Sequence, residues 1–109
     1  MSKPQIGTFS LKNDGGFVAK LQFVYVDDQG NKKHVTGTGD ITLGCTASAD
    51  PGNYGVPDGA DVSLYAFVVW GTDNEAKQVF TYTKGSKVQA NYVITGTTLN
   101  NELALINIE

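Results

Sequence analysis

Apolar and polar residues alternate along most of this chain, which is the pattern of a β-strand with one buried and one solvated face. The clearest example is the segment 17–26, where one face carries Phe17, Ala19, Leu21, Phe23 and Tyr25. The segment 62–70 repeats the pattern with Val62, Leu64, Ala66, Val68 and Trp70 on one face. No segment has the spacing of an amphipathic helix. The pattern therefore predicts a chain built from strands.

Further strands are predicted over 6–11, 33–36, 40–43, 46–50, 79–83, 88–94 and 103–108. Turn residues separate them, above all the Asn-Asp-Gly-Gly sequence at 13–16, the Asp/Asn/Gly segment 27–32 and the Pro/Gly-rich segment 51–59. Strands at this spacing predict an all-β fold, an antiparallel β-sandwich of about eight strands. The length of 109 residues corresponds to a single domain over 1–109.

Composition excludes several kinds of partner. The chain has 8 Lys and Arg against 11 Asp and Glu, a net charge of −3, and no basic cluster. Such a chain cannot neutralise phosphates, so neither nucleic acid nor electrostatic attraction to anionic lipid is expected. The single cysteine, Cys45, cannot form an intrachain disulfide and is predicted to be a small buried or half-buried residue. No signal peptide follows Met1, which predicts a protein that is cytoplasmic as translated or exported by a non-classical route.

Catalytic chemistry is not indicated. The only histidine, His34, lies in a Lys-Lys-His-Val run and is predicted to be solvated. It has no nucleophile beside it in the sequence, and one histidine with one cysteine cannot build a transition-metal site without carboxylates. The Asp27-Asp28-Gln-Gly-Asn31 segment is predicted to be a turn because it lacks the closing glutamate of a calcium loop. We therefore expect no enzyme activity, no metal and no cofactor.

Several segments resemble one protein family. The run NDGGFVAKLQF at 13–23 is similar to the "SGGYVAQFNISW" and "SGAYVAQYYVTW" segments of the cholesterol-dependent (thiol-activated) cytolysins. The segments 25–31, 56–60 and 94–99 resemble in turn that family's "YDHQGKE", "IPL" and "ISIWGTTLYP". Order and spacing agree with the C-terminal membrane-recognition domain, from about Phe9 to Leu105. The resemblance implies a β-sandwich whose tip loops meet the target cell.

The resemblance also implies roles for particular residues. The Thr-Leu pair of the family's GTTL motif recognises sterol and corresponds to Thr98 and Leu99, and the neighbouring tip loop corresponds to Asn13–Phe17, which includes Asp14. The tryptophan-rich undecapeptide "ECTGLAWEWWR" is replaced by VVWGTDNEAKQ at 68–78. Pore formation by this chain alone is not expected, because the family's pore-forming domains have no counterpart in it.

The segment that replaces the undecapeptide suggests a sugar site. An aromatic ring can cover the apolar face of a sugar, and short polar side chains can bind its hydroxyls. The predicted ligand-binding residues are Trp70, Thr72, Asp73, Asn74, Glu75, Thr98, Leu99, Asn100, Asn101 and Asp14. In the alternative interpretation Trp70 and Leu99 pack inside, and the polar residues only form turns.

Three functions remain open. The first is a small lectin that binds glycans at a cell surface through its tip loops, presented as a homodimer or larger assembly. The second is a cholesterol-dependent membrane-binding module without pore activity. The third is a toxin-associated interaction protein.

Overall fold

The structure, a computed structural model, describes residues 3–109 and is an all-β sandwich, as the sequence predicts. Its strands are β1 (Gln5–Ile6), β2 (Thr8–Gly15), β3 (Ala19–Val26), β4 (Lys32–Val35), β5 (Asp40–Ile41), β6 (Thr46–Ala49), β7 (Asp61–Val68), β8 (Asn74–Glu75), β9 (Phe80–Tyr82), β10 (Gln89–Gly96) and β11 (Asn101–Ile108). One short 3-10 helix, η1 (Pro51–Tyr54), follows β6. No helix within residues 3–109 is long and apolar enough to cross a bilayer.

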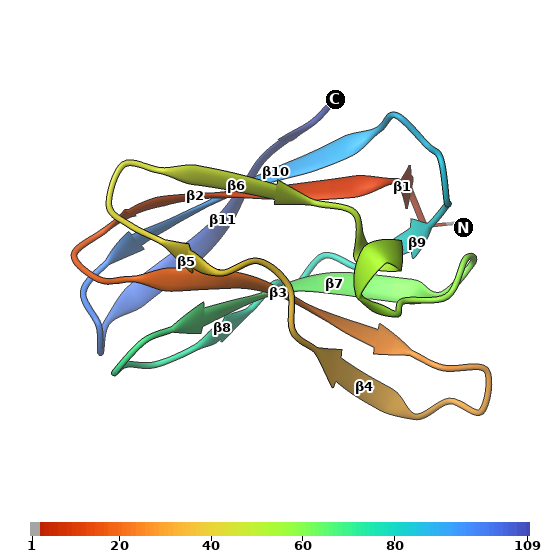
Figure 1. The fold of residues 1–109 in the computed structure, drawn as a ribbon, viewed down its shortest axis with the longest axis horizontal. Coiled ribbons are helices and arrows are strands. Elements are labelled where there is room, and N and C mark those ends of the chain that lie inside the picture. The colour runs from red at the N-terminus through yellow and green to blue at the C-terminus, as the bar shows by residue number, and fades with distance from the viewer. Residues whose placement is uncertain (1–2) are drawn as a thin grey trace.

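Two sheets pack face to face (Figure 1). The larger sheet has the order β1-β9-β7-β3-β4, with β5 also paired to β3 and β8 also paired to β7. The smaller sheet has the order β11-β10-β2-β6. Most pairs are antiparallel, but β2 pairs with β10 and β1 with β9 in parallel, so both sheets are mixed. Short strands such as β1, β5 and β8 bring the total within the described chain to eleven.

The core lies between the two sheets and uses the faces that the alternation predicts. Phe9 of β2 is at its centre, with its ring centroid 5.8 Å from Phe23, 5.7 Å from Phe80 and 6.2 Å from Tyr92. The predicted inner faces of β3 and β7 are buried from Ala19 to Phe23 and from Val62 to Val68. Edge-on and tilted aromatic contacts of this kind add to the free energy gained by burying the rings.

Three local predictions are wrong. The hairpin turn does not begin at Asn13, because β2 continues to Gly15 and the side chain of Asn13 is completely buried. The strand predicted to reach Trp70 ends at Val68, and Trp70 points away from the core. Cys45 is exposed, because it lies in the turn between β5 and β6. All three residues lie near strand ends, where the alternation of apolar and polar residues does not indicate which side chains are buried.

Candidate functional site

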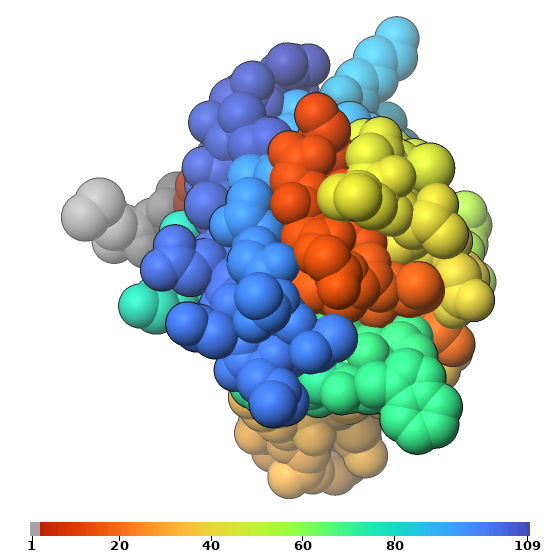
Figure 2. Space-filling model, turned by 90° about the vertical axis from the view of Figure 1, so that its left-hand side faces the viewer, coloured from red at the N-terminus to blue at the C-terminus, as the bar shows by residue number. Residues whose placement is uncertain are grey.

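Four loops meet at one end of the sandwich, which we call the tip. They are the β2–β3 loop (residues 16–18), the β5–β6 loop (42–45), the β7–β8 loop (69–73) and the β10–β11 loop (97–100). Figure 2 looks onto this end, where the segments from the four loops lie side by side although they are far apart in the sequence. The sequence hypothesis required such convergence of loops at one pole.

Backbone hydrogen bonds hold the loops together. The amide of Gly16 donates to the carbonyl of Gly96 at 3.0 Å, and the amide of Thr72 donates to the carbonyl of Thr98 at 2.7 Å. The amide of Gly44 donates to the carbonyl of Asn13 at 2.7 Å, which ties the β5–β6 loop to the end of β2. The tip is therefore one connected surface rather than four independent loops.

Two glycines allow this close approach. A side chain on Gly71 would place its Cβ 2.1 Å from the carbonyl oxygen of Thr98, so only glycine fits between the β7–β8 and β10–β11 loops. Gly96 has a φ of 108° and ends β10, and a Cβ there would lie 2.4 Å from the carbonyl oxygen of Asn100. These contacts explain why glycine precedes Thr72 in one loop and Thr97 in the other.

Leu99 lies near the middle of the β10–β11 loop, which spans residues 97–100. The loop closes on itself through Thr97, whose amide donates to the carbonyl of Asn100 at 2.9 Å and whose hydroxyl accepts from the amide of Asn100 at 3.1 Å. This closure turns the Leu99 side chain outward, where 75% of it is exposed. The structure therefore contradicts the interpretation in which Leu99 packs inside, because the side chain is exposed to solvent.

Trp70 is also turned outward. It is the one described residue other than glycine with a positive φ, 64°, and 93% of its surface is exposed. The left-handed conformation is costly for a bulky residue and persists only where surrounding contacts impose it. Here Asp73 supplies them, since its carboxylate accepts from the amide of Val68 at 2.8 Å and from the hydroxyl of Tyr65 at 2.6 Å.

Leu43, which the sequence analysis did not select, completes an apolar set at the tip. It lies in the β5–β6 loop and is 65% exposed. Leu43, Trp70 and Leu99 are the three most exposed large apolar residues of the described chain. The signal was present in the sequence, because Leu43 follows a threonine and precedes a turn residue just as Leu99 does.

Three of the polar residues selected from the sequence hold the tip together. The side-chain amide of Asn101 donates to the carbonyl oxygens of Thr72 at 2.9 Å, Thr97 at 3.2 Å and Thr98 at 3.3 Å. The side-chain amide of Asn74 in turn donates to the backbone carbonyl and to the side-chain Oδ1 of Asn101. Asp73, Asn74 and Asn101 are half-buried, and their polar groups are engaged within the protein.

Two selected residues lie beside the tip rather than on it. Glu75 is on β8 and forms an ion pair with Lys32 of β4 at 2.8 Å. Asp14 is near the end of β2 and pairs with Lys12 at 3.7 Å.

The side chains of Thr72, Thr98 and Asn100 make no hydrogen bond to any other residue from 3 to 109, and all three belong to the tip loops.

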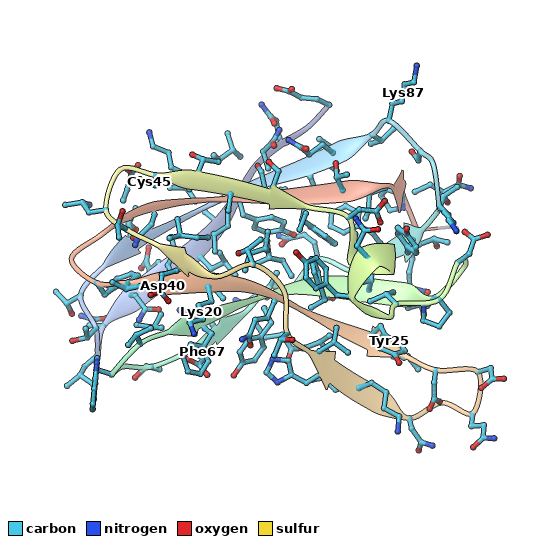
Figure 3. All side chains as sticks on the ribbon, in the orientation of Figure 1. Lys20, Tyr25, Asp40, Cys45, Phe67 and Lys87 are labelled. Carbon is cyan, nitrogen blue, oxygen red and sulfur yellow. The ribbon has the colours of Figure 1, made fainter. Side chains whose placement is uncertain are left out.

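The outer face of the larger sheet carries polar and aromatic residues behind the tip. Figure 3 shows Lys20 between Asp40 and Phe67, with Nζ 3.7 Å from the carboxylate and 5.9 Å from the ring centroid.

Tyr65 of β7 has a raised pKa. Burial of the side chain, together with its hydrogen bond to Asp73, raises this pKa to about 12. The raised pKa means that Tyr65 remains protonated, and a donor to Asp73, to a higher pH than an exposed tyrosine.

A hollow of about 470 Å³ lies away from the tip, between the β3–β4 turn and the segment before β7. Four aspartates line it, but the carboxylate of Asp27 accepts from the amides of Gln29 and Asn31, and that of Asp58 accepts from the amide of Lys84. Residues 3–109 contain no cluster of three His, Cys, Asp or Glu side chains that could hold a metal ion. Two of the four aspartates that line the hollow, Asp27 and Asp58, are thus engaged with backbone amides.

Comparison with known proteins identifies the fold. No family model and no curated protein sequence matches the chain. Among solved structures it is similar to listeriolysin O over 94% of this chain and 22% of that one, with 21% identity and a TM-score of 0.52. A crystal structure titled "Gram Negative Toxin" matches over 92% of this chain and 22% of that one, with 16% identity and a TM-score of 0.51.

A match to the isolated membrane-binding domain of pneumolysin covers 93% of this chain and 96% of that one, at 17% identity and a TM-score of 0.46. The fold assignment rests on listeriolysin O and the Gram-negative toxin. This chain spans about a fifth of the length of each of them. At these identities the likeness concerns the fold, and the function has to be argued from the tip. The chain has the fold of the C-terminal domain of the cytolysins, as the sequence resemblance implied.

Proposed function

We propose that the tip binds the surface of a membrane, with Trp70, Leu99 and Leu43 entering the boundary between headgroups and acyl chains. The observation that carries this proposal is that the three most exposed large apolar side chains come from three different loops and gather at one pole. Exposed apolar residues concentrated in this way mark interaction sites. Tryptophan in particular favours the membrane–water interface.

The charges near the tip support insertion of this kind. Asp73 is the only charged residue in the four loops, and its carboxylate is already paired with an amide and a hydroxyl inside the protein. Burying each leucine contributes about 1.5–3 kcal/mol, and tryptophan contributes more because of its larger area. The expected result is reversible binding that depends on apolar contact.

The fluorescence of the protein tests this directly, because Trp70 is its single tryptophan. Neutral phosphatidylcholine vesicles, with and without cholesterol, should shift its emission to shorter wavelength and carry the protein upward in flotation. The double variant Leu43→Ser, Leu99→Ser should lose most of this binding. Val26→Ser changes an exposed valine at the other end of β3 and is the matched control. Unshifted emission with both vesicle types would refute membrane binding.

The vesicle composition separates two forms of the proposal. Thr98 and Leu99 are the residues that the sequence resemblance assigns to sterol recognition. Binding that requires cholesterol and is lost in Thr98→Ala would support sterol recognition. Equal binding to both vesicles would support a general interfacial module.

A second candidate function, glycan binding, is favoured by the surroundings of Trp70. Its exposed ring could cover a sugar face, and Thr72, Thr98 and Asn100 are in the same loop cluster with side chains not engaged within residues 3–109. Asp73, Asn74 and Asn101 would then support this site rather than contact sugar. Shallow sites of this kind bind weakly, so a lectin would gain from forming a homodimer or larger assembly.

A glycan array probed with and without a chelator tests the second candidate. Binding that survives Trp70→Phe but is lost in Trp70→Ala would support stacking of a sugar on the ring. No signal at high protein concentration would exclude the lectin. The two functions are distinguished by the vesicle experiment, which contains no glycan.

A further inference from the structure

Strand β11 forms an open edge of the smaller sheet. Seven of its eight residues pair with β10 on one side, and Ile106 is left out of the register at a β-bulge. Beyond Asn101, which contacts Asn74, no strand of residues 3–109 pairs with the other side of β11. Ile106 is 56% exposed and Ile108 43% exposed on this strand. Figure 1 shows β11 running from the tip to the C-terminus of the chain.

The other edges of the sandwich are short or charged. β1 has two residues, β6 has four, and β4 carries Lys32 and Lys33. Natural proteins protect long edges with lysine, proline or bulges, because the unpaired backbone groups otherwise recruit another strand. β11 has neither lysine nor proline, and its single charge is Glu102 at one end. Its one bulge, at Ile106, leaves the stretch from Asn101 to Leu105 in regular register.

We propose that β11 pairs antiparallel with β11 of a second copy, joining two four-stranded sheets into one continuous sheet. The position of its charge favours this partner and this direction. Parallel pairing in register would set Glu102 against Glu102, whereas antiparallel pairing places each glutamate near the isoleucines at the far end of the partner strand. The central Leu103-Ala104-Leu105 sequence then pairs with itself about a two-fold axis.

This geometry decides how the two tips are arranged. β11 begins at Asn101, which is bonded to the tip loops, and ends at Ile108, opposite Ala90 at the far end of β10. An antiparallel partner therefore points its tip in the opposite direction. If the tip binds membranes as proposed above, the dimer bridges two membranes instead of placing both tips on one.

Light scattering of the intact protein over a concentration series tests the pairing. We expect twice the mass of the single chain, falling to the single-chain mass in the double variant Ala104→Lys, Ile106→Lys, which places lysines on the exposed edge. Ser48→Lys on β6, the other edge of the same sheet, is the matched control and should remain a dimer. Circular dichroism checks that each variant is folded. A wild-type monomer at every concentration, or a dimer unaffected by the two lysines, overturns the proposal.

Cysteine cross-linking tests the direction. In a Cys45→Ser background, single cysteines are placed at positions 103, 104, 105 and 106 in turn. Antiparallel pairing about a two-fold axis sets at most one residue opposite its own copy. With Leu103-Ala104-Leu105 at the axis that residue is Ala104, so a disulfide dimer should form strongly at position 104 alone. Equal cross-linking at all four positions would indicate parallel pairing, and none would exclude β11 as the interface.

Vesicle turbidity tests the bridging. The wild-type protein should aggregate neutral vesicles, whereas Ala104→Lys, Ile106→Lys should float with them without aggregating them. Equal aggregation by both proteins overturns bridging through β11. If neither protein floats with vesicles, the proposed membrane function fails, while the light-scattering result still decides the dimer.

Discussion

Asp73 and Asn101 show how single side chains fix the tip. Asp73 joins the end of β7 to Tyr65, and Asn101 joins three carbonyl oxygens from two loops. Both side chains are half-buried and hold the β7–β8 and β10–β11 loops, which carry Trp70 and Leu99. Asp73, Asn74 and Asn101, chosen from the sequence as sugar ligands, are thus engaged in hydrogen bonds within the protein.

Replacing Asp73 with alanine should free Trp70. The amide of Val68 and the hydroxyl of Tyr65 would lose their acceptor, at a cost of about 1–3 kcal/mol in the free energy of unfolding. The fluorescence anisotropy of Trp70 should fall because the β7–β8 loop loses its anchor. Asp28→Ala, an exposed aspartate in the β3–β4 turn, is the control. Unchanged anisotropy in Asp73→Ala would contradict this role.

Two tyrosines should make the fold sensitive to alkaline pH. Burial, reinforced by a hydrogen bond to Asp73 or to Asp50, raises the pKa values of Tyr65 and Tyr82 to about 12 from the ordinary 10.0. Above pH 10 the unfolded chain loses these protons while the folded chain keeps them. The stabilisation is therefore complete below pH 10 and is lost as the pH rises through 12.

Urea unfolding at a series of alkaline pH values, with tyrosinate absorbance recorded in parallel, checks this loss of stability. Tyr65→Phe should unfold with a shallower dependence on pH than the wild type. A stability that stays constant from pH 10 to 12 would show that these tyrosines titrate normally.

At the scale of elements, the tip depends on how strands end. Asn13 is the clearest example, because its side-chain amide donates to the carbonyl oxygens of Phe17 at 2.6 Å and Ile41 at 2.8 Å, and its Oδ1 accepts from the amide of Gly15 at 2.9 Å. One buried side chain thus connects the end of β2 to the β2–β3 loop and to β5. Its sequence context, Asn-Asp-Gly-Gly, is nevertheless that of an exposed hairpin turn.

Asn13→Ala should be among the most destabilising polar substitutions in this protein. Three backbone groups would lose their partners in a buried site, and we expect a loss of about 3 kcal/mol. Chemical denaturation followed by circular dichroism measures it. Asn53→Ala, an exposed asparagine in η1, should change stability little. Similar values for the two variants would contradict the role of Asn13 as the connecting residue.

Gly71→Ala tests the contact between two loops. Its Cβ would meet the carbonyl oxygen of Thr98, so the β7–β8 and β10–β11 loops must separate, at a cost of about 1–3 kcal/mol. Vesicle binding should weaken as Trp70 and Leu99 move apart. Gly39→Ala, where a Cβ meets nothing within 4 Å, should leave both stability and binding unchanged. Normal binding by Gly71→Ala would mean that the loops act independently.

At the scale of the whole molecule, charge and apolar surface are separated. The chain has a net charge of −3, while the four tip loops hold no lysine or arginine. Attraction to anionic lipid would need such residues near the surface. Membrane binding by this protein should therefore be driven by burial of the apolar tip side chains and not by electrostatic attraction between the whole protein and the lipid.

Binding to vesicles should accordingly resist salt. Raising the ionic strength screens charge–charge attraction but leaves apolar burial intact. Flotation at low and high salt, on neutral and on anionic vesicles, should give equal bound fractions or a slight preference for neutral lipid. Strong release by salt would indicate that lysines elsewhere on the surface carry the interaction.

The fold was largely predictable because alternation records burial. The inner faces of β3 and β7 follow from their apolar residues, since a slip of one position would turn them toward solvent. The local family motifs gave the same architecture. The alternation failed at Trp70, where it extended the inner face of β7 by one residue too many, because the strand ends through a contact with Asp73 from the next loop.

The all-β sandwich, its core faces, its net negative charge and the loops that hold the motifs follow from the order of residues along single strands. The meeting of the loops, the grouping of Leu43 with Trp70 and Leu99, and the hydrogen bonds of Asp73, Asn74 and Asn101 within the protein are set by packing and appear only in the folded molecule. The physical reason is that hydrogen bonds between distant loops and the exposure of a loop side chain arise from packing in three dimensions. No periodicity within one segment encodes them.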